Sequence, residues 1–595
     1  MVLTSDNKFS EIYDIIKNDS LHGESVLILV ARDCDSISAC KILTEILKSD
    51  SISYNIKPVS GLEDLENVDI SLLENEEIKS IIMINCGGNL DITTVFSNLT
   101  AEQVVYIFDS HRPYSIENIN NTHNALIIDD GTYNEQLKNQ QEEDEDDDEY
   151  DDEEEEEEDG DDDDDDEYDE NDKENNNDNN SEIDENNLKS KNKKRNKRKY
   201  RNNKKNKKKE KVEKTYYGRS AAMSMYKIST TLQKQNLDDL LWYSVLGLTD
   251  QLIHEKISLE SYEEQYKEFK QLILNEFPND DGETEFDTPQ NKQIVGDRII
   301  PTDDFRFMLY RHWNLYESLY NSRFVACKLR IWKSKGKFLL DSLFAMMGIP
   351  LDQVKQKYVS MNIHYKKSLK QLLALNGPKF GLINLYFNSF LKKYQCNAEI
   401  SASDTVYAVT ALMESDNLEI DQTDEEIWEQ NFWEAYDSIS SKNIDLLKIG
   451  LKQSIELQKE ITRQVAAMIE KRSVILSGPF RYAFITESSE LKYFIHPLAL
   501  TKLGLFMMDA FIAMGKARKP FLIGSLNEKK QAYLIVGISG SHSSDIQSNQ
   551  FGAHFRKSAE YTNAILKYQS FDTSIIEVSK SDLHKFVEHL HSSLI

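Results

Sequence analysis

A short apolar run followed directly by two aspartates, within residues 25–41, constrains the fold more than any other stretch of the chain. Residues Val26 to Ala31 are apolar and too few to span a bilayer, which is typical of a strand buried on both faces. Asp33 and Asp35 follow, and from Ser36 onward apolar residues recur at helical spacing. The stretch predicts a strand, an acidic turn and a helix, and in parallel sheets this is the edge where ligands bind.

The two aspartates allow two interpretations. Carboxylates beyond the end of a parallel strand supply the oxygen ligands of a hard divalent cation. The same side chains can instead cap the helix and balance the positive end of its dipole. This stretch alone favours neither interpretation.

The rest of residues 1–135 also alternates between strand and helix patterns. Further strand-like runs cover residues 53–60, 78–85, 104–108 and 125–128. Four or five strands separated by helical patterns predict a largely parallel sheet. Asn85 follows one of these runs, and Asp109 and His111 follow another, so we expect them beside the first acidic pair. Asp250 ends a later apolar run and is a fourth candidate acidic position.

Charge is distributed unevenly along the 595 residues, whose formal net charge is −33. Residues 142–170 contain 26 acidic residues in 29, whereas residues 189–211 contain 15 lysines or arginines and one glutamate. Without these two tracts the chain still carries −21. An acidic body argues against the broad phosphate-binding surface of a nonspecific nucleic-acid binder, although a local groove can still be positive.

Cysteine usage and hydropathy bear on the compartment. The five cysteines are scattered and form no CxxC pair, so neither a disulfide framework nor a zinc ribbon is indicated. A reducing, intracellular compartment fits this pattern. No apolar run approaches the roughly 20 residues of a membrane helix, and the first residues lack a signal-peptide pattern. We expect a soluble protein with no membrane partner.

Composition also suggests domain boundaries. Residues 136–214 hold almost no large apolar side chain and predict a disordered insertion, acidic and then basic. Its basic run at 191–199 is typical of nuclear import or nucleic-acid contact, and a solvated linker is an equal alternative. Residues 215–250 would complete the first α/β domain, residues 251–470 predict an all-helical domain, and residues 471–595 a smaller α/β domain.

Taken together, these residues resemble the DHH phosphoesterases and, more closely, the cell division control protein 45 family. The matching segments are residues 33–43, 58–61, 85–87, 108–114, 247–250, 354–358, 412–415 and 477–480. The resemblance implies a DHH-type α/β domain with a mostly parallel sheet, an all-helical insertion specific to the family, and a smaller DHHA1-like α/β domain at the C-terminal end.

The resemblance also implies a degenerate metal site. Active DHH enzymes hydrolyse phosphoric esters with two manganese or magnesium ions held by Asp and His side chains. The corresponding positions here are Asp33, Asp35, Asn85, Asp109, His111 and Asp250. Asn85 stands where an active enzyme has Asp, and Leu29, Ala31 and Ser110 replace three further ligands. We therefore expect no catalytic residue, no cofactor, and at most weak binding of one magnesium or manganese ion.

By the same resemblance, the protein is a non-catalytic scaffold subunit of the nuclear replicative helicase. It would join the MCM ring and the GINS complex in DNA replication initiation and elongation, with replicative polymerase and loading factors as further partners. No Walker motif is present, so the chain is not the motor. Two alternatives stay open: an active metal-dependent phosphoesterase or exonuclease, and a single-stranded DNA-binding module that uses the groove between the two α/β domains.

Overall fold

The computed structural model describes eleven segments of the chain. They are residues 3–5, 8–72, 77–120, 124–131, 214–237, 239–276, 297–395, 398–415, 424–487, 490–540 and 548–594. The predicted charged insertion, with its basic run at 191–199, lies outside the described residues except for Lys214. Cys396 lies outside them as well.

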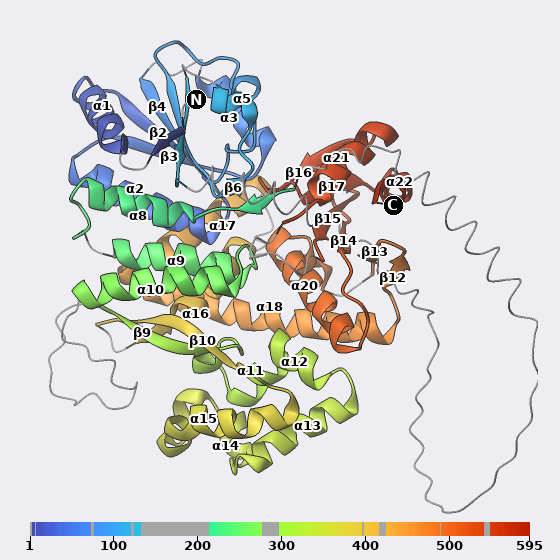
Figure 1. Ribbon diagram of the computed structural model, residues 1–595. Helices are drawn as coiled ribbons and strands as arrows, with labels where there is room; N and C mark the ends of the chain where they lie inside the picture. Colours follow the sequence, from blue (N-terminus) through green and yellow to red (C-terminus); the bar gives the residue numbers. More distant parts are fainter. Residues whose placement is uncertain are drawn as a thin grey trace, which may run out of the picture. The chain divides into compact units, whose positions relative to one another are not determined.

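A six-stranded sheet built from parallel pairs forms the first α/β unit (Figure 1). Its strands are β1 (Leu3–Ser5), β2 (Ser25–Ala31), β3 (Tyr54–Val59), β4 (Ile78–Ile84), β5 (Val104–Phe108) and β7 (Ala125–Asp129). The order across the sheet is β1-β7-β5-β4-β2-β3. Strand β2 is buried along Val26–Ala31, as its unbroken apolar run predicts. The parallel sheet is confirmed, although the short edge strand β1 was not predicted.

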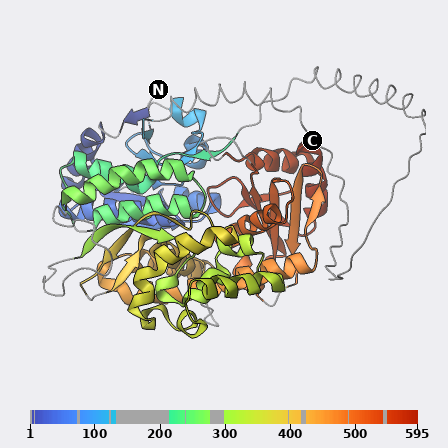
Figure 2. The same ribbon diagram turned by 60° about the horizontal axis from the view of Figure 1, so that its bottom comes forward.

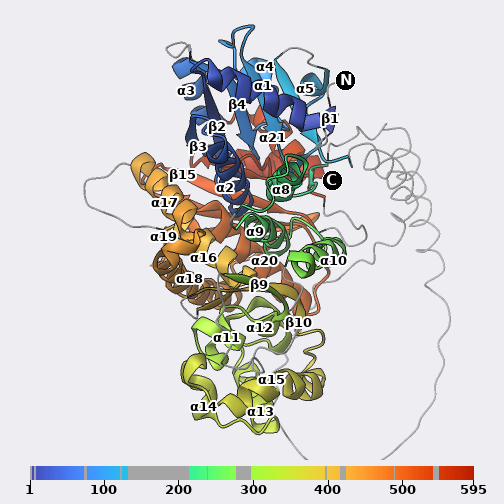
Figure 3. The same cartoon turned by 90° about the vertical axis from the view of Figure 1, so that its left-hand side faces the viewer.

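Helices flank this sheet, and several of them come from beyond the charged insertion. They are α1 (Phe9–Leu21), α2 (Cys34–Ser49), α3 (Leu62–Leu72), α4 (Ile92–Val95), α5 (Ile116–Asn120), α8 (Ala221–Thr231) and α9 (Leu240–Ile253). Strand β8 (Tyr216–Tyr217) pairs with β6 (His111–Arg112). Helix α2 packs against α8 and α9, so that 13 of its residues are buried (Figure 3). This packing buries Asp35 in the first turn of α2, whereas Asp33 just before the helix is half-buried.

The middle of the chain is mainly helical but holds a small sheet. Its helices are α10 (Leu259–Glu276), α11 (Leu315–Asn321), α12 (Arg323–Leu329), α16 (Ala402–Met413), α17 (Asp424–Ser438) and α18 (Ile444–Glu470). Strands β9 (Arg298–Phe305), β10 (Tyr386–Lys393) and β11 (Glu399–Ser401) form an antiparallel sheet in the order β11-β10-β9. The expectation of an all-helical domain was wrong in this respect. The sheet forms because β10 pairs with β9 from about 80 residues earlier, a contact with no local signal.

Three further helices of the middle region pack with α11 and α12 around one hydrophobic core. They are α13 (Ser334–Met346), α14 (Leu351–Lys355) and α15 (Ile363–Asn376); a 3₁₀ turn at Tyr358–Ser360 lies between α14 and α15, and another at Gly377–Phe380 follows α15. Their shared core includes Leu340, Phe344, Leu369 and Leu373. We call residues 333–386 the α13–α15 module, and Figure 3 shows its helices together.

A second six-stranded sheet, of mixed direction, forms the C-terminal unit (Figure 2). Its strands are β12 (Ile475–Ser477), β13 (Phe480–Ile485), β14 (Phe521–Asn527), β15 (Ala532–Ile538), β16 (Leu566–Tyr568) and β17 (Ile575–Ser579), in the order β12-β13-β14-β15-β17-β16. Its helices are α19 (Leu491–Phe494), α20 (Pro497–Ala513), α21 (Phe551–Thr562) and α22 (Leu583–Leu594). The predicted second α/β unit is confirmed.

No helix within the described ranges has both the length and the apolar composition that a bilayer crossing requires. Four of the five cysteines are described, and all four are buried free thiols.

Candidate functional site: a pocket of neutralised carboxylates

The predicted site residues meet at the carboxyl edge of the first sheet. Strand β4 lies between β2 and β5, so the residues that follow these three strands are neighbours. Direct hydrogen bonds join the Asn85 side chain to the Asp35 carboxylate and to the backbone N–H of Ser110. The structure therefore brings together the residues that the sequence placed at this edge.

Asp33 caps helix α2. Its carboxylate accepts hydrogen bonds from the Ser36 backbone N–H at 2.7 Å and the Ser36 hydroxyl at 2.9 Å. Its backbone is extended, as at most N-caps. The capping interpretation of Asp33 is therefore confirmed.

Asp35 is buried in the first turn of α2 and is surrounded by N–H donors. Its carboxylate accepts hydrogen bonds from the backbone N–H groups of Ala221 and Ala222, at 2.9 and 3.0 Å, and from Asn85 Nδ2 at 3.0 Å. Burial, together with the nearby Asp33 carboxylate, raises the pKa of Asp35 to about 6. Asp35 thereby fastens α2 to the N-terminus of α8, which follows the charged insertion.

Asn85 bridges two strand ends and explains why an amide suits this position. Its backbone is in the left-handed region, with φ of 53°, which Asn tolerates better than most residues. Its Nδ2 donates to Asp35, and its Oδ1 accepts the Ser110 backbone N–H at 2.9 Å. An aspartate here would set two carboxyl groups about 3 Å apart in the interior, where they could not both ionise without strong repulsion. The amide turns that repulsion into a hydrogen bond.

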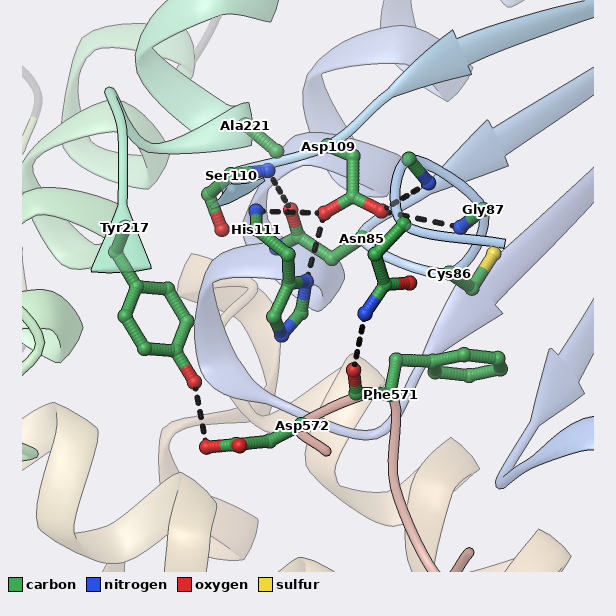
Figure 4. A network of polar contacts seen from close by, with 12 residues as sticks. Asn85, Cys86, Gly87, Asp109, Ser110, His111, Tyr217, Ala221, Phe571 and Asp572 are labelled. Atoms are coloured by element: carbon green, nitrogen blue, oxygen red, sulfur yellow. Dashed lines mark hydrogen bonds and ion pairs between the residues drawn. The ribbon is translucent and has the colours of Figure 1, made fainter. Parts of the chain in front are cut away.

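The Asp109 carboxylate is also saturated by N–H donors (Figure 4). It accepts the backbone N–H groups of Gly87 at 3.0 Å and Gly88 at 2.6 Å, and the backbone N–H of His111 at 2.8 Å. The imidazole Nδ1 of His111 lies 2.7 Å from the same carboxylate. Burial disfavours the charged forms of both Asp109 and His111, but the attraction between the two groups is stronger. The pKa of Asp109 is therefore lowered and the pKa of His111 is raised.

The Asp109–His111 pair predicts a specific pH dependence. Because the folded pKa of His111 is raised, its contribution to stability is complete below the unfolded value near 6.5 and is lost as pH rises through the folded pKa. Asp109 has a lowered pKa, so its contribution is lost only as pH falls through its folded pKa. We expect His111→Gln to be less stable than the wild type at pH 6 and to show a smaller loss of stability between pH 6 and 9. Urea denaturation between pH 6 and 9 measures the stability of both proteins. Parallel stability-versus-pH profiles of His111→Gln and wild type would contradict the prediction.

Arg112 does not pair with the Asp109 carboxylate, although it is three residues away in the sequence. Its guanidinium donates to the Asp109 backbone carbonyl at 2.7 Å and pairs with Asp130 at 3.2 Å. It also lies 3.9 Å from the centre of the Tyr114 ring.

Asp250 lies near the end of α9 and pairs with the ammonium of Lys256, which follows the helix. The ammonium of Lys256 lies 3.1 Å from one carboxylate oxygen, and His254 Nδ1 lies 3.0 Å from the other. Burial would raise the pKa of Asp250, but Lys256 and His254 hold it well below the ordinary range. The sequence identified Asp250 and missed Lys256, for which the signal was a lysine six residues after a predicted ligand.

These residues do not fit a two-metal cage. A metal ligand must direct a lone pair at the ion, whereas the carboxylates of Asp35 and Asp109 accept hydrogen bonds from N–H donors. Asp250 faces an ammonium. In the described part of the chain, no three or more His, Cys, Asp or Glu side chains are grouped so as to hold a metal. The weak magnesium or manganese binding expected from the sequence stays a prediction.

Close packing around Asp35 gives a second prediction. A Cβ added at Gly247 of α9 would lie 2.4 Å from an Asp35 carboxylate oxygen and 2.6 Å from the Ala222 methyl group. We expect Gly247→Ala to cost about 1–3 kcal/mol of stability through overpacking. Ser244→Ala, one turn earlier, removes a buried hydroxyl that has no hydrogen-bond partner and is the matched control. Urea denaturation of both variants measures the two losses of stability. Equal stabilities would refute the destabilising effect of the added Cβ at Gly247.

The same pocket is bonded to the C-terminal sheet. A cavity of about 370 Å³ is lined by Asp33, Lys256 and Asp572, among others. The Tyr217 hydroxyl donates to the Asp572 carboxylate at 2.9 Å (Figure 4), and Asn89 Nδ2 donates to the Phe571 carbonyl at 3.0 Å. Phe571 and Asp572 belong to the loop between β16 and β17, and nothing local in the sequence marks that loop as a partner of residues over 350 positions earlier.

Comparison with known proteins decides the family. The sequence profile of CDC45 matches residues 26–593. The cell division control protein 45 homolog of Dictyostelium discoideum is 72% identical, over 100% of this chain and 99% of the relative. The chain belongs to the CDC45 family. The homolog of Schizosaccharomyces pombe is 35% identical over 98% of both chains. The crystal structure of CDC45 from Entamoeba histolytica superposes with a TM-score of 0.69 at 24% identity, over 99% of both chains, and so shares the fold.

CDC45 membership confirms the resemblance inferred from the sequence. It makes the protein a nuclear factor of DNA replication initiation, a component of the CMG helicase with MCM and GINS as partners, and not an enzyme. The buried carboxylate of Asp35 instead joins α2 to the start of α8 and to Asn85 after β4.

Proposed function

We propose that the protein acts as a non-catalytic brace between the MCM ring and GINS, and that the α13–α15 module supplies a contact with them. The observation that carries this proposal is the surface of the module. Eight of the nineteen exposed large apolar side chains among the described residues lie between residues 338 and 386. They are Phe338, Met346, Leu351, Val359, Ile363, Leu375, Ile383 and Tyr386.

The charge of the module indicates what it binds. Residues 333–386 contain nine lysines, two aspartates and no arginine or glutamate, a net charge of +7, whereas the whole chain carries −33. Eight of the nine lysines are exposed. Lysines interspersed with exposed aliphatic side chains favour an acidic, partly apolar protein surface over nucleic acid, because aliphatic groups gain nothing beside phosphates. We infer that the occupant is such a surface on an MCM or GINS subunit.

Hydrogen–deuterium exchange tests this proposal. Purified MCM ring and purified GINS would be added separately to the full-length protein, and exchange would be followed in peptides from α13, α14 and α15. We expect slower exchange in these peptides with at least one of the two partners, and weaker protection at high salt. Protection confined to other elements with both partners would place the interface elsewhere.

Replicative polymerase and loading factors are further proposed partners, by family resemblance alone. For the single-stranded DNA alternative, salt-sensitive binding that survives deletion of residues 189–211 would support a groove between the two α/β units. The hydrolase alternative is disfavoured by the donors around Asp35 and Asp109. Manganese-dependent hydrolysis lost in Asp33→Ala would revive it.

A further inference from the structure

A cluster of cations surrounds the turn between α12 and α13, two helices that pack against each other (Figure 1). Residues 318–340 contain six lysines or arginines and no acidic residue. Five of these six side chains are exposed, and we call them the basic turn: Lys328, Arg330, Lys333, Lys335 and Lys337. None of the five forms an ion pair within the described part of the chain, whereas the sixth, Arg323, pairs with Glu255 and Asp509.

The backbone of this turn is held in place while its cations face solvent. Leu329 and Ile331 are buried in two different hydrophobic cores. A Cβ added at Gly336 would lie 2.4 Å from the Arg330 carbonyl oxygen, so the first turn of α13 packs closely on the end of α12. The Cα atoms of the five cations are therefore held close together before any partner binds.

These lysines lie where they do not stabilise the isolated protein. Lys335 and Lys337 are in the first turn of α13 and Lys333 directly precedes it, a place where the helix dipole favours acidic residues. The first turn holds no acidic residue that would offset them. Like charges that repel one another and oppose a helix dipole weaken a fold, which indicates that the lysines serve binding.

The basic turn differs from the rest of the module surface. No large apolar side chain between residues 322 and 337 is exposed, whereas the stretch from Phe338 to Tyr386 holds eight. Phe338 is 67% exposed and directly follows Lys337, so the charged part and the apolar part of the surface are continuous. Two adjoining parts of different chemistry can act at different stages of one binding reaction.

We propose that the basic turn steers a cluster of carboxylates on the MCM or GINS partner to the module, after which the apolar side chains hold the complex. This inference rests on the function proposed above for the module. Charges act beyond contact distance and change mainly the rate of association, whereas buried apolar contacts change mainly the rate of dissociation. The same cations attract nucleic-acid phosphates, but phosphates gain nothing from the adjoining aliphatic side chains, so the occupant is an acidic protein surface.

Separate measurement of association and dissociation rates tests this proposal. Fluorescently labelled GINS and labelled MCM ring would each be mixed with the full-length protein in a stopped-flow instrument, at low and at high salt. The turn variant is Lys333→Gln/Lys335→Gln/Lys337→Gln, and the apolar variant is Val359→Ala/Leu375→Ala. All of the replaced side chains are exposed, and equal unfolding midpoints would show that both variants are folded.

The charge control is Lys529→Gln/Lys530→Gln/Lys580→Gln. It removes three positive charges from exposed lysines of the C-terminal unit and so has the same net charge as the turn variant. We expect this control to associate at the wild-type rate, because steering depends on where the charges lie. A control that is slowed as much as the turn variant would overturn the proposal, since net charge alone would then explain the rates.

With at least one partner, the turn variant should associate about tenfold more slowly at low salt and dissociate within about twofold of wild type. Its association rate should also depend less on salt. The apolar variant should associate normally and dissociate severalfold faster. Wild-type association of the turn variant, beside faster dissociation of the apolar variant, would overturn this inference alone.

Wild-type rates of both variants with both partners would remove the function proposed for the module as well. Labelled single-stranded DNA is the probe for the competing occupant. If the turn variant lost affinity for this DNA and bound both protein complexes at wild-type rates, the basic turn would be a nucleic-acid contact and the proposal would be wrong.

Discussion

Replacing Asp35 with alanine is expected to destabilise the protein by about 3–5 kcal/mol, the largest effect of any single change at the site. The substitution leaves the backbone N–H groups of Ala221 and Ala222 and the amide of Asn85 without their shared acceptor. These donors are buried, and unpaired buried donors are costly. Because Asp35 joins α2 to the start of α8, the loss should spread to the packing of both helices. Urea denaturation followed by circular dichroism measures it.

Asp33→Asn is the matched control for that experiment. Asp33 is two residues away and carries the same group, but its role is to cap α2, and asparagine caps helices about as well as aspartate. We expect this variant to unfold within about 0.5 kcal/mol of wild type. Asp35→Asn should still be clearly destabilised, since its NH₂ group would face N–H donors. If Asp35→Asn were as stable as Asp33→Asn, the carboxylate network would not be what holds α2 and α8 together.

Placing acidic side chains on the α13–α15 module is expected to weaken helicase assembly by about tenfold or more in Kd. Val359 and Leu375 are 76% and 69% exposed, so Val359→Asp combined with Leu375→Asp should leave the fold intact. The two new charges would oppose an acidic partner and remove apolar contact area. Fluorescence anisotropy with labelled GINS, and separately with labelled MCM ring, would give the affinities.

Leu21→Asp is the control for surface acidity in general, because Leu21 is 81% exposed at the end of α1, far along the chain from the module. We expect its binding to match wild type. Unfolding midpoints of all variants should agree, which would show that the module variant is folded. Unchanged affinity of Val359→Asp/Leu375→Asp for both partners would remove the module from the proposed interface.

Local patterns predicted the first sheet and its acidic edge well. The apolar run of β2 and the helical spacing after Ser36 are both short-range signals, and parallel order follows from alternation of strands and helices. Asp33, Asn85 and Asp109 could be placed together because parallel strands end on one side of a sheet. The family resemblance predicted that Asn85 replaces a metal-binding aspartate. The structure shows why an amide suits this position, because Asn85 donates a hydrogen bond to Asp35.

Features that depend on distant contacts could not be predicted in this way. Strand β10 is recognisable only beside β9, and β1 is three residues long. Nothing in the sequence distinguishes Lys256 from a surface lysine. The turn at Glu255, which directs its side chain inward, is apparent only in the structure. The contact of Tyr217 with Asp572 joins two segments more than 350 residues apart. In each case the decisive interaction lies outside the window in which periodicity and capping carry information.

A protein that joins MCM and GINS without chemistry of its own should be isolated together with both complexes. Affinity capture of the tagged full-length protein from S-phase chromatin, with nuclease present to remove DNA bridges, tests it most directly. We expect near-stoichiometric MCM and GINS subunits, in amounts unaffected by Asp33→Asn. Capture of neither complex, together with manganese-dependent hydrolysis by the purified protein, would contradict it.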